Sequence, residues 1–80
     1  MVEYEYRVDE GRLVHVDMSK RTITVEDRWG YKWTYRLSED IELSEDWIIN
    51  HLDKTVKIFY KYEAGKYRTG PCIVLKIEEI

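Results

Sequence analysis

The chain has 80 residues, of which 44% are hydrophobic and 36% charged, with four Gly, one Pro and a net charge of −3. This length holds one domain, residues 1–80, and is too small for the architecture of a large enzyme. The composition excludes a disordered or fibrous chain, and no apolar run approaches the ~20 residues of a membrane span. We therefore expect a soluble, cytoplasmic domain with no membrane partner.

The first half of the chain alternates apolar and polar residues, which is typical of half-buried strands. Residues 2–8 alternate, and the pattern resumes after Gly11 through Val16, so we predict one long strand that bends or bulges at Gly11. Its tyrosines, Tyr4 and Tyr6, share a phase with valines and are expected in the core. Residues 22–26 and 31–37 predict the second and third strands, with Gly30 in the turn between them.

The periodicity changes at Ser44. This residue is a suitable helix cap, and the apolar residues from Trp47 to Leu52 fall at helical spacing, so a helix of about two turns is predicted near Ser44 to Leu52. Alternation returns in residues 55–62 and again from about Cys72 to Glu78, which predicts two final strands.

Taken together, the predicted elements are three strands, a short helix and two strands. That order indicates a mainly β fold: a small five- to six-stranded Greek-key barrel of the oligonucleotide/oligosaccharide-binding (OB) type, with its helix between strands three and four. A division of the first strand at Gly11 would instead give a six-stranded Src-homology-type or Sm-like barrel, and the sequence leaves both alternatives open.

A resemblance to a family accompanies this pattern. Residues 11–17 and 22–27, followed by Gly30, resemble the opening hairpins of small OB-like β-barrel domains of unknown function, which run glycine, valines, aspartate, a turn and then Thr-(Ile/Leu)-Thr-Val. The resemblance covers about a quarter of the chain and involves turn and core positions. It implies a fold and no site.

Charge is distributed unevenly along the chain. Residues 38–53 carry six acidic side chains and no basic one, whereas residues 54–76 carry six basic side chains and one acidic one. A net negative charge argues against a general nucleic-acid binder, because phosphate binding needs clustered Lys and Arg. The scarcity of amides, with no Gln and one Asn, is typical of proteins from thermophiles.

No residues form a catalytic or metal-binding motif. Cys72, His15 and His51 lack the spacing of a zinc site or of a nucleophile with its base, and Cys72 is expected to fill space beside an apolar strand. The acidic residues 39–46 lack the regular spacing and central glycine of a calcium loop. We therefore expect no metal, no cofactor and no enzymatic activity.

Eleven aromatic residues exceed what a small core needs, and several of them alternate with bases. Such residues can stack on nucleic-acid bases beside phosphate-binding cations, or anchor a protein interface. The candidate binding residues are Arg28, Trp29, Lys57, Phe59, Lys61, Lys66, Tyr67 and Arg68. The favoured hypothesis is a non-catalytic module that binds a protein partner or itself; the alternative is an OB-type domain that binds single-stranded nucleic acid.

Overall fold

The computed structural model describes all 80 residues and contains five strands and one short helix. In chain order the elements are β1 (Tyr4–Asp17), β2 (Thr22–Glu26), β3 (Lys32–Leu37), α1 (Glu45–His51), β4 (Thr55–Glu63) and β5 (Ile73–Glu79). A mainly β chain with one short helix is thus confirmed. β1 runs without a break through Gly11, so the six-stranded alternative that divides this strand is wrong.

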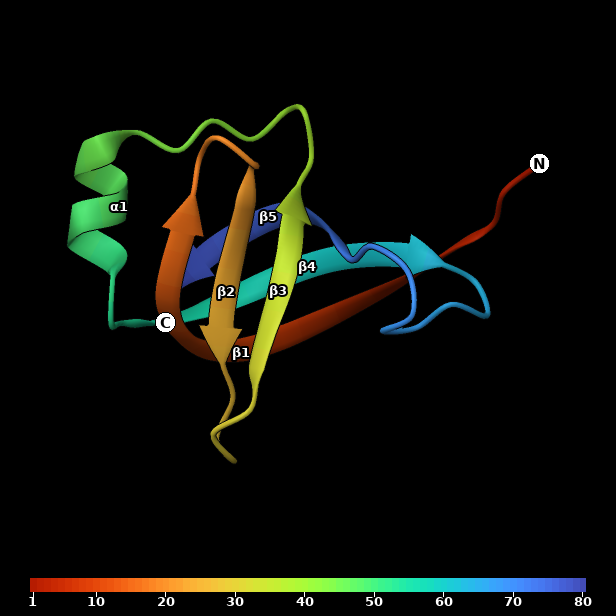
Figure 1. Ribbon diagram of the computed structural model, residues 1–80, viewed down its shortest axis with the longest axis horizontal. Helices are drawn as coiled ribbons and strands as arrows, with labels where there is room; N and C mark the ends of the chain where they lie inside the picture. Colours follow the sequence, from red (N-terminus) through yellow and green to blue (C-terminus); the bar gives the residue numbers. More distant parts are fainter.

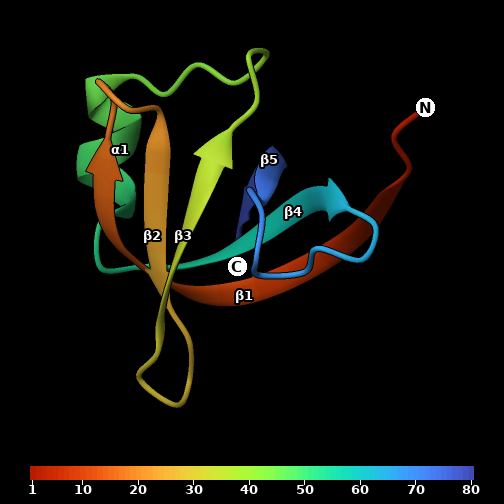
Figure 2. The same cartoon turned by 45° about the vertical axis from the view of Figure 1, so that its right-hand side comes forward.

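The strands form one closed sheet in the order β1, β2, β3, β5, β4, and the pairing of β4 with β1 completes it. All strand contacts are antiparallel except that between β3 and β5, which consists of only two residue pairs, Arg36 with Ile73 and Leu37 with Val74. In Figures 1 and 2, β2 and β3 lie side by side, while the first half of β1 extends away from them beside β4. The barrel is therefore incompletely closed along the first half of β3.

The two halves of β1 pair with different strands. Residues from Tyr4 to Arg12 pair with β4, and residues from Arg12 to Asp17 pair with β2. The strand bends between these halves (Figure 1). Gly11, next to the residue at which the two pairings meet, packs against β2. A Cβ atom on Gly11 would collide with Val25 Cγ1 and lie 2.6 Å from the carbonyl oxygen of Glu26. Only glycine allows this close approach.

The core comprises 11 buried side chains from β1 to β5 and the segment before β5: Leu13, Ile23, Val25, Tyr35, Leu37, Val56, Ile58, Tyr60, Tyr62, Cys72 and Val74. Cys72 is a free, buried thiol, as expected. The prediction that Tyr4 and Tyr6 belong to the core is wrong, since they are 40% and 68% exposed. Their half of β1 extends past β2 and β3, so no second layer covers them.

Helix α1 begins and ends one residue inside the predicted segment. The Ser44 hydroxyl accepts a hydrogen bond from the Trp47 N–H at 3.1 Å and so caps the helix. At the other end, the buried His51 ring stacks on the Trp47 ring with centroids 4.1 Å apart. The helix has seven residues, and no helix of this protein is long and apolar enough to cross a membrane.

Replacing Gly11 with alanine should destabilise the protein by about 1–3 kcal/mol, because the added methyl group forces β1 and β2 apart at the bend. Gly70→Ala is the matched control: its Cβ would lie 3.5 Å from the nearest atom, so we expect a change within about 0.5 kcal/mol. Urea unfolding followed by far-UV circular dichroism measures both values. Equal stability of the two variants would contradict the proposed packing at Gly11.

Candidate interaction site

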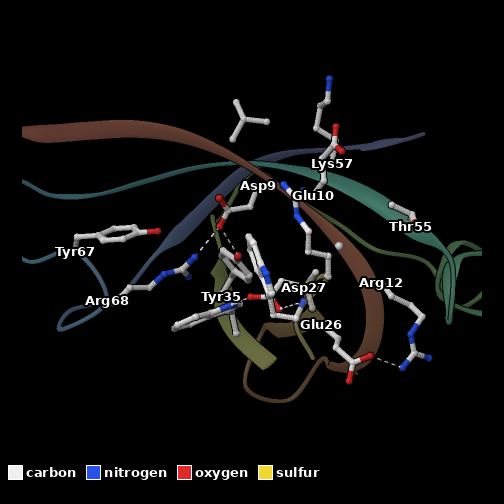
Figure 3. Close-up of a pocket in the computed structure, with 16 residues that line it drawn as sticks. Asp9, Glu10, Arg12, Glu26, Asp27, Tyr35, Thr55, Lys57, Tyr67 and Arg68 are labelled. Carbon is white, nitrogen blue, oxygen red and sulfur yellow. Dashed lines mark hydrogen bonds and ion pairs between the residues drawn. The ribbon is translucent and has the colours of Figure 1, made fainter. Parts of the chain in front are cut away.

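An open groove of about 990 Å³ lies where β1 separates from β2. One wall is the middle of β1, residues 8–12, and the opposite wall is the end of the β2–β3 hairpin, residues 25–29. The rest of the lining comes from three further segments (Figure 3): Trp33 and Tyr35 of β3, Thr55 and Lys57 of β4, and Tyr67 and Arg68 of the β4–β5 loop. The groove thus occupies the part of the barrel that the strands leave open.

The inner end of the groove is organised around the Asp9 carboxylate. Its Oδ2 atom accepts a hydrogen bond from the Tyr35 hydroxyl at 2.7 Å and lies 2.7 Å from Nη2 of Arg68 (Figure 3). The Arg68 guanidinium also lies 4.2 Å from the centre of the Trp33 ring and 4.9 Å from that of Tyr67. Arg68 has a left-handed backbone with φ of 64°, and its loop is joined to the barrel chiefly through side chains. The cluster therefore fixes this loop over the incomplete side of the barrel.

Burial keeps the Tyr35 phenol in its neutral, protonated form. Desolvation, followed by the hydrogen bond to the Asp9 carboxylate, raises the pKa of this phenol far above its usual range. The hydroxyl therefore remains a proton donor at every ordinary pH. Through this hydrogen bond the hydroxyl helps to hold the Asp9 carboxylate in place.

The outer end of the groove is the tip of the β2–β3 hairpin, which Asp27 organises. Its carboxylate accepts hydrogen bonds from the backbone N–H groups of Trp29 at 2.9 Å and Tyr31 at 3.0 Å, and from Trp33 Nε1 at 2.9 Å. The Trp33 bond is the largest of the effects that lower the pKa of Asp27. The same contacts hold Trp29 outward, with 71% of its surface exposed.

The structure brings together five of the eight predicted binding residues. Those that line the groove are Arg28, Trp29, Lys57, Tyr67 and Arg68. Arg28 lies 4.7 Å from the centre of the Trp29 ring. Figure 3 shows Lys57 pointing away from the cluster of Asp9 and Arg68. The usable candidates inside the groove are therefore Arg28, Trp29 and Tyr67.

The other three candidates, Phe59, Lys61 and Lys66, lie outside the groove. Phe59 is on the outer face of β4 between Lys57 and Lys76, whose Nζ atoms lie 6.0 and 5.5 Å from its ring centre. Lys61 lies on the same face, 4.3 Å from the Tyr4 ring. These residues alternate with buried ones along β4 and so point away from the barrel interior.

Two basic candidates are also neutralised by ion pairs. Lys66 pairs with Glu63 at 2.5 Å in the exposed turn after β4. Arg68, which sequence reasoning treated as a free cation, is ion-paired with Asp9 and only 20% of its side chain is exposed. Neither is free to bind a phosphate without breaking an existing contact.

The charges in the groove balance. Its lining contains four acidic side chains, Asp9, Glu10, Glu26 and Asp27, and four basic ones, Arg12, Arg28, Lys57 and Arg68. Arg12 pairs with Glu26 at 2.8 Å and also with Asp53 outside the groove. Of the basic groups, only Arg28 and Lys57 make no ion pair. The groove consequently offers little attraction for a polyanion.

Sequence reasoning missed the residues that organise the groove. Asp9 lies in an alternating stretch that carries no sign of a site, and Tyr35 and Trp33 respectively belong to the core and pack against it. Asp9 and Arg68 are 59 positions apart, so only the closure of the sheet brings them together. The local signals that pointed to this site were the Asp27-Arg28-Trp29-Gly30 turn and the neighbouring candidates Tyr67 and Arg68.

No group of three or more His, Cys, Asp or Glu side chains is placed to hold a metal ion. Comparison with known proteins adds no family, since no family model, curated protein or solved structure matches this chain. The function must therefore be argued from the geometry of the groove itself.

The hairpin tip gives a test at acid pH. A lowered folded-state pKa means that Asp27 contributes stability above its unfolded pKa of ~3.9, and loses this contribution as the pH falls through the folded value. Asp27→Asn removes that titration, so its urea midpoint should fall less steeply than that of the wild type between pH 4 and about pH 2.

Asp40→Asn serves as the control, because Asp40 is exposed and makes no side-chain hydrogen bond. It should retain the acid dependence of the wild type. If Asp27→Asn retains that dependence as well, the carboxylate does not organise the hairpin tip in the way described.

Proposed function

We propose that this protein is a non-catalytic interaction module that binds an extended segment of a protein partner in the groove. The observation that carries this proposal is the combination of balanced charges, half of them ion-paired, with exposed aromatic side chains on two sides of the groove. Trp29 stands on the hairpin tip, and Tyr67, 39% exposed, stands on the β4–β5 loop. Exposed Trp, Tyr and Arg are the residue types that dominate binding energy at protein interfaces.

We propose further that the barrel is of the OB type. The strand order, the short parallel contact between β3 and β5, and a helix that follows β3 in the chain all support this assignment. Fold type alone does not define a ligand, since unrelated functions share one fold. The proposed partner therefore rests on the chemistry of the groove.

Single-stranded nucleic acid is the alternative ligand. Its binding by aromatic stacking requires cations that follow the phosphate backbone. Here, Lys57 points away from the cluster and Arg68 is paired with Asp9, which leaves Arg28 as the available cation beside Trp29. The acidic segment of residues 38–53 adds repulsion. A protein segment, which needs no continuous row of cations, fits this groove better.

The test is a selection of random dodecapeptides displayed on phage against the immobilised chain, with counter-selection on the Trp29→Ala variant. Enriched peptides are then synthesised and titrated calorimetrically. Trp29→Ala and Tyr67→Ala should each weaken binding about tenfold or more, as expected for aromatic anchors. Ile49→Ala is the control, since Ile49 on α1 is as exposed as Trp29 but lies outside the groove. It should bind like the wild type.

Salt distinguishes the two ligand classes. Peptide binding should change little between low and moderate salt, whereas nucleic-acid binding weakens steeply because phosphate contacts release counterions. A titration with mixed-sequence single-stranded DNA and RNA completes the experiment. Tight nucleic-acid binding that is lost with salt and with Trp29→Ala would overturn the proposal, as would a selection that yields no peptide sensitive to Trp29→Ala.

A further inference from the structure

The first half of β1 has one paired edge and one free edge. Two backbone hydrogen bonds show which residues of β1 bond to β4. The Ala64 N–H donates to the Glu3 oxygen, and the Leu13 N–H donates to the Lys54 oxygen. Odd-numbered residues of this half consequently bond to β4, and the backbone groups of the even-numbered residues face away from it. β2 begins to pair only at Arg12. The free edge therefore carries the N–H and C=O groups of Tyr4, Tyr6, Val8 and Glu10.

This edge carries few of the features that normally prevent edge-to-edge pairing. Lysine, proline and bulges, three of the usual protections, are absent from residues 4–8, whose only charged side chains are Glu5 and Arg7. Instead, Tyr4, Tyr6 and Val8 form an apolar row on the outer face, with 40%, 68% and 51% of their surfaces exposed. The opposite face of the same segment carries Glu5 and Arg7.

We propose that a second copy of this chain pairs with this edge, so that two β1 strands run antiparallel about a two-fold axis at Tyr6. Tyr6 then faces Tyr6 of the second copy, Tyr4 faces Val8 of the second copy, and Val8 faces its Tyr4. These are three hydrogen-bonded pairs with about six interchain backbone bonds. The interface is isologous, as a closed dimer requires.

Charge selects this register. With Tyr6 on the axis, Glu5 lies opposite Arg7 of the second copy, and Arg7 lies opposite its Glu5. Moving the axis by one residue in either direction would place Glu5 opposite Glu5, or Arg7 opposite Arg7, and like charges in cross-strand pairs are destabilising. Asp9, which faces Glu3 of the second copy, is already neutralised by Arg68. Among these three registers, only the one with Tyr6 on the axis keeps both Glu5 and Arg7 from facing a like charge.

The pairing also reaches the groove. In this register, Val2 of the second copy lies opposite Glu10, which lines the groove. The second copy would thus extend the β1 wall of the site. Self-association does not depend on the proposed peptide binding, since it uses the backbone edge of β1 and requires no ligand.

Sedimentation equilibrium of the 80-residue chain, from micromolar to millimolar concentration without peptide, tests the dimer. The wild type should dimerise. Tyr6→Pro should weaken the dimer about tenfold or more: proline removes an N–H that faces the free edge, whereas the bonds between β1 and β4 involve other residues. The ultraviolet circular dichroism spectrum and thermal unfolding of each variant verify its fold.

Charge reversal provides the sharper test. Glu5→Arg and Arg7→Glu should each weaken the homodimer several-fold, because each places two like-charged pairs across the axis. An equimolar mixture of these two variants should form a heterodimer, and the double variant Glu5→Arg/Arg7→Glu should dimerise again. Glu39→Arg, an equal change of charge in the exposed loop before α1, should leave the dimer unchanged.

A wild type that remains monomeric at millimolar concentration would overturn the proposal. So would a dimer that persists in Tyr6→Pro, or charge-reversed variants that the mixture fails to restore. If the dimer is not found, the proposed Trp29-dependent binding of peptides is not contradicted. Conversely, a chain that dimerises as described but selects no peptide would contradict only the proposed function.

Discussion

The bend of β1 is the feature on which the rest of the structure depends. One strand of 14 residues serves two neighbours, β4 through its first half and β2 through its second. It can change partners because Gly11 packs against Val25 and Glu26 where no Cβ would fit. The separation of β1 from β2 at this point opens the groove and also leaves the first half of β1 with a free edge. Both proposed binding surfaces follow from this single bend.

The open part of the barrel is filled by polar and aromatic side chains rather than by another strand. Asp9, Tyr35 and Arg68 form a satisfied cluster within aromatic rings, and no buried side-chain polar atom lacks a partner. A fully satisfied network of this kind fixes the β4–β5 loop without leaving a costly unpaired charge. The binding surface can then be aromatic and electrically balanced, which is why the groove suits a protein segment better than a polyanion.

Much of the fold was predictable, because local patterns determine its elements. The Ser44 cap and the helical spacing after it located α1, and alternation located the strands. Alternation shows which residues share a face, but not whether anything covers that face, so Tyr4 and Tyr6 were wrongly placed in the core. A bulge between Leu13 and His15 also changes the phase of β1, burying Leu13 where the pattern favoured Val14. For the site, the exposed hairpin tip was visible in the sequence, whereas the pairing of Asp9 with Arg68 depends on closure of the sheet.

Amide hydrogen exchange in β1, measured by NMR on dilute monomeric protein, tests most directly whether one strand serves two partners. The account predicts alternation in the first half: the amides of Glu5, Arg7 and Asp9 are protected by β4, while those of Tyr4, Tyr6 and Val8 exchange rapidly. Leu13, which bonds to Lys54, should be protected as well. Uniform protection of residues 4–9 in the monomer would show that the edge is covered, and uniform rapid exchange would show that β1 and β4 do not pair there. Either result would contradict the conclusion that the bend of β1 produces both the groove and the free edge.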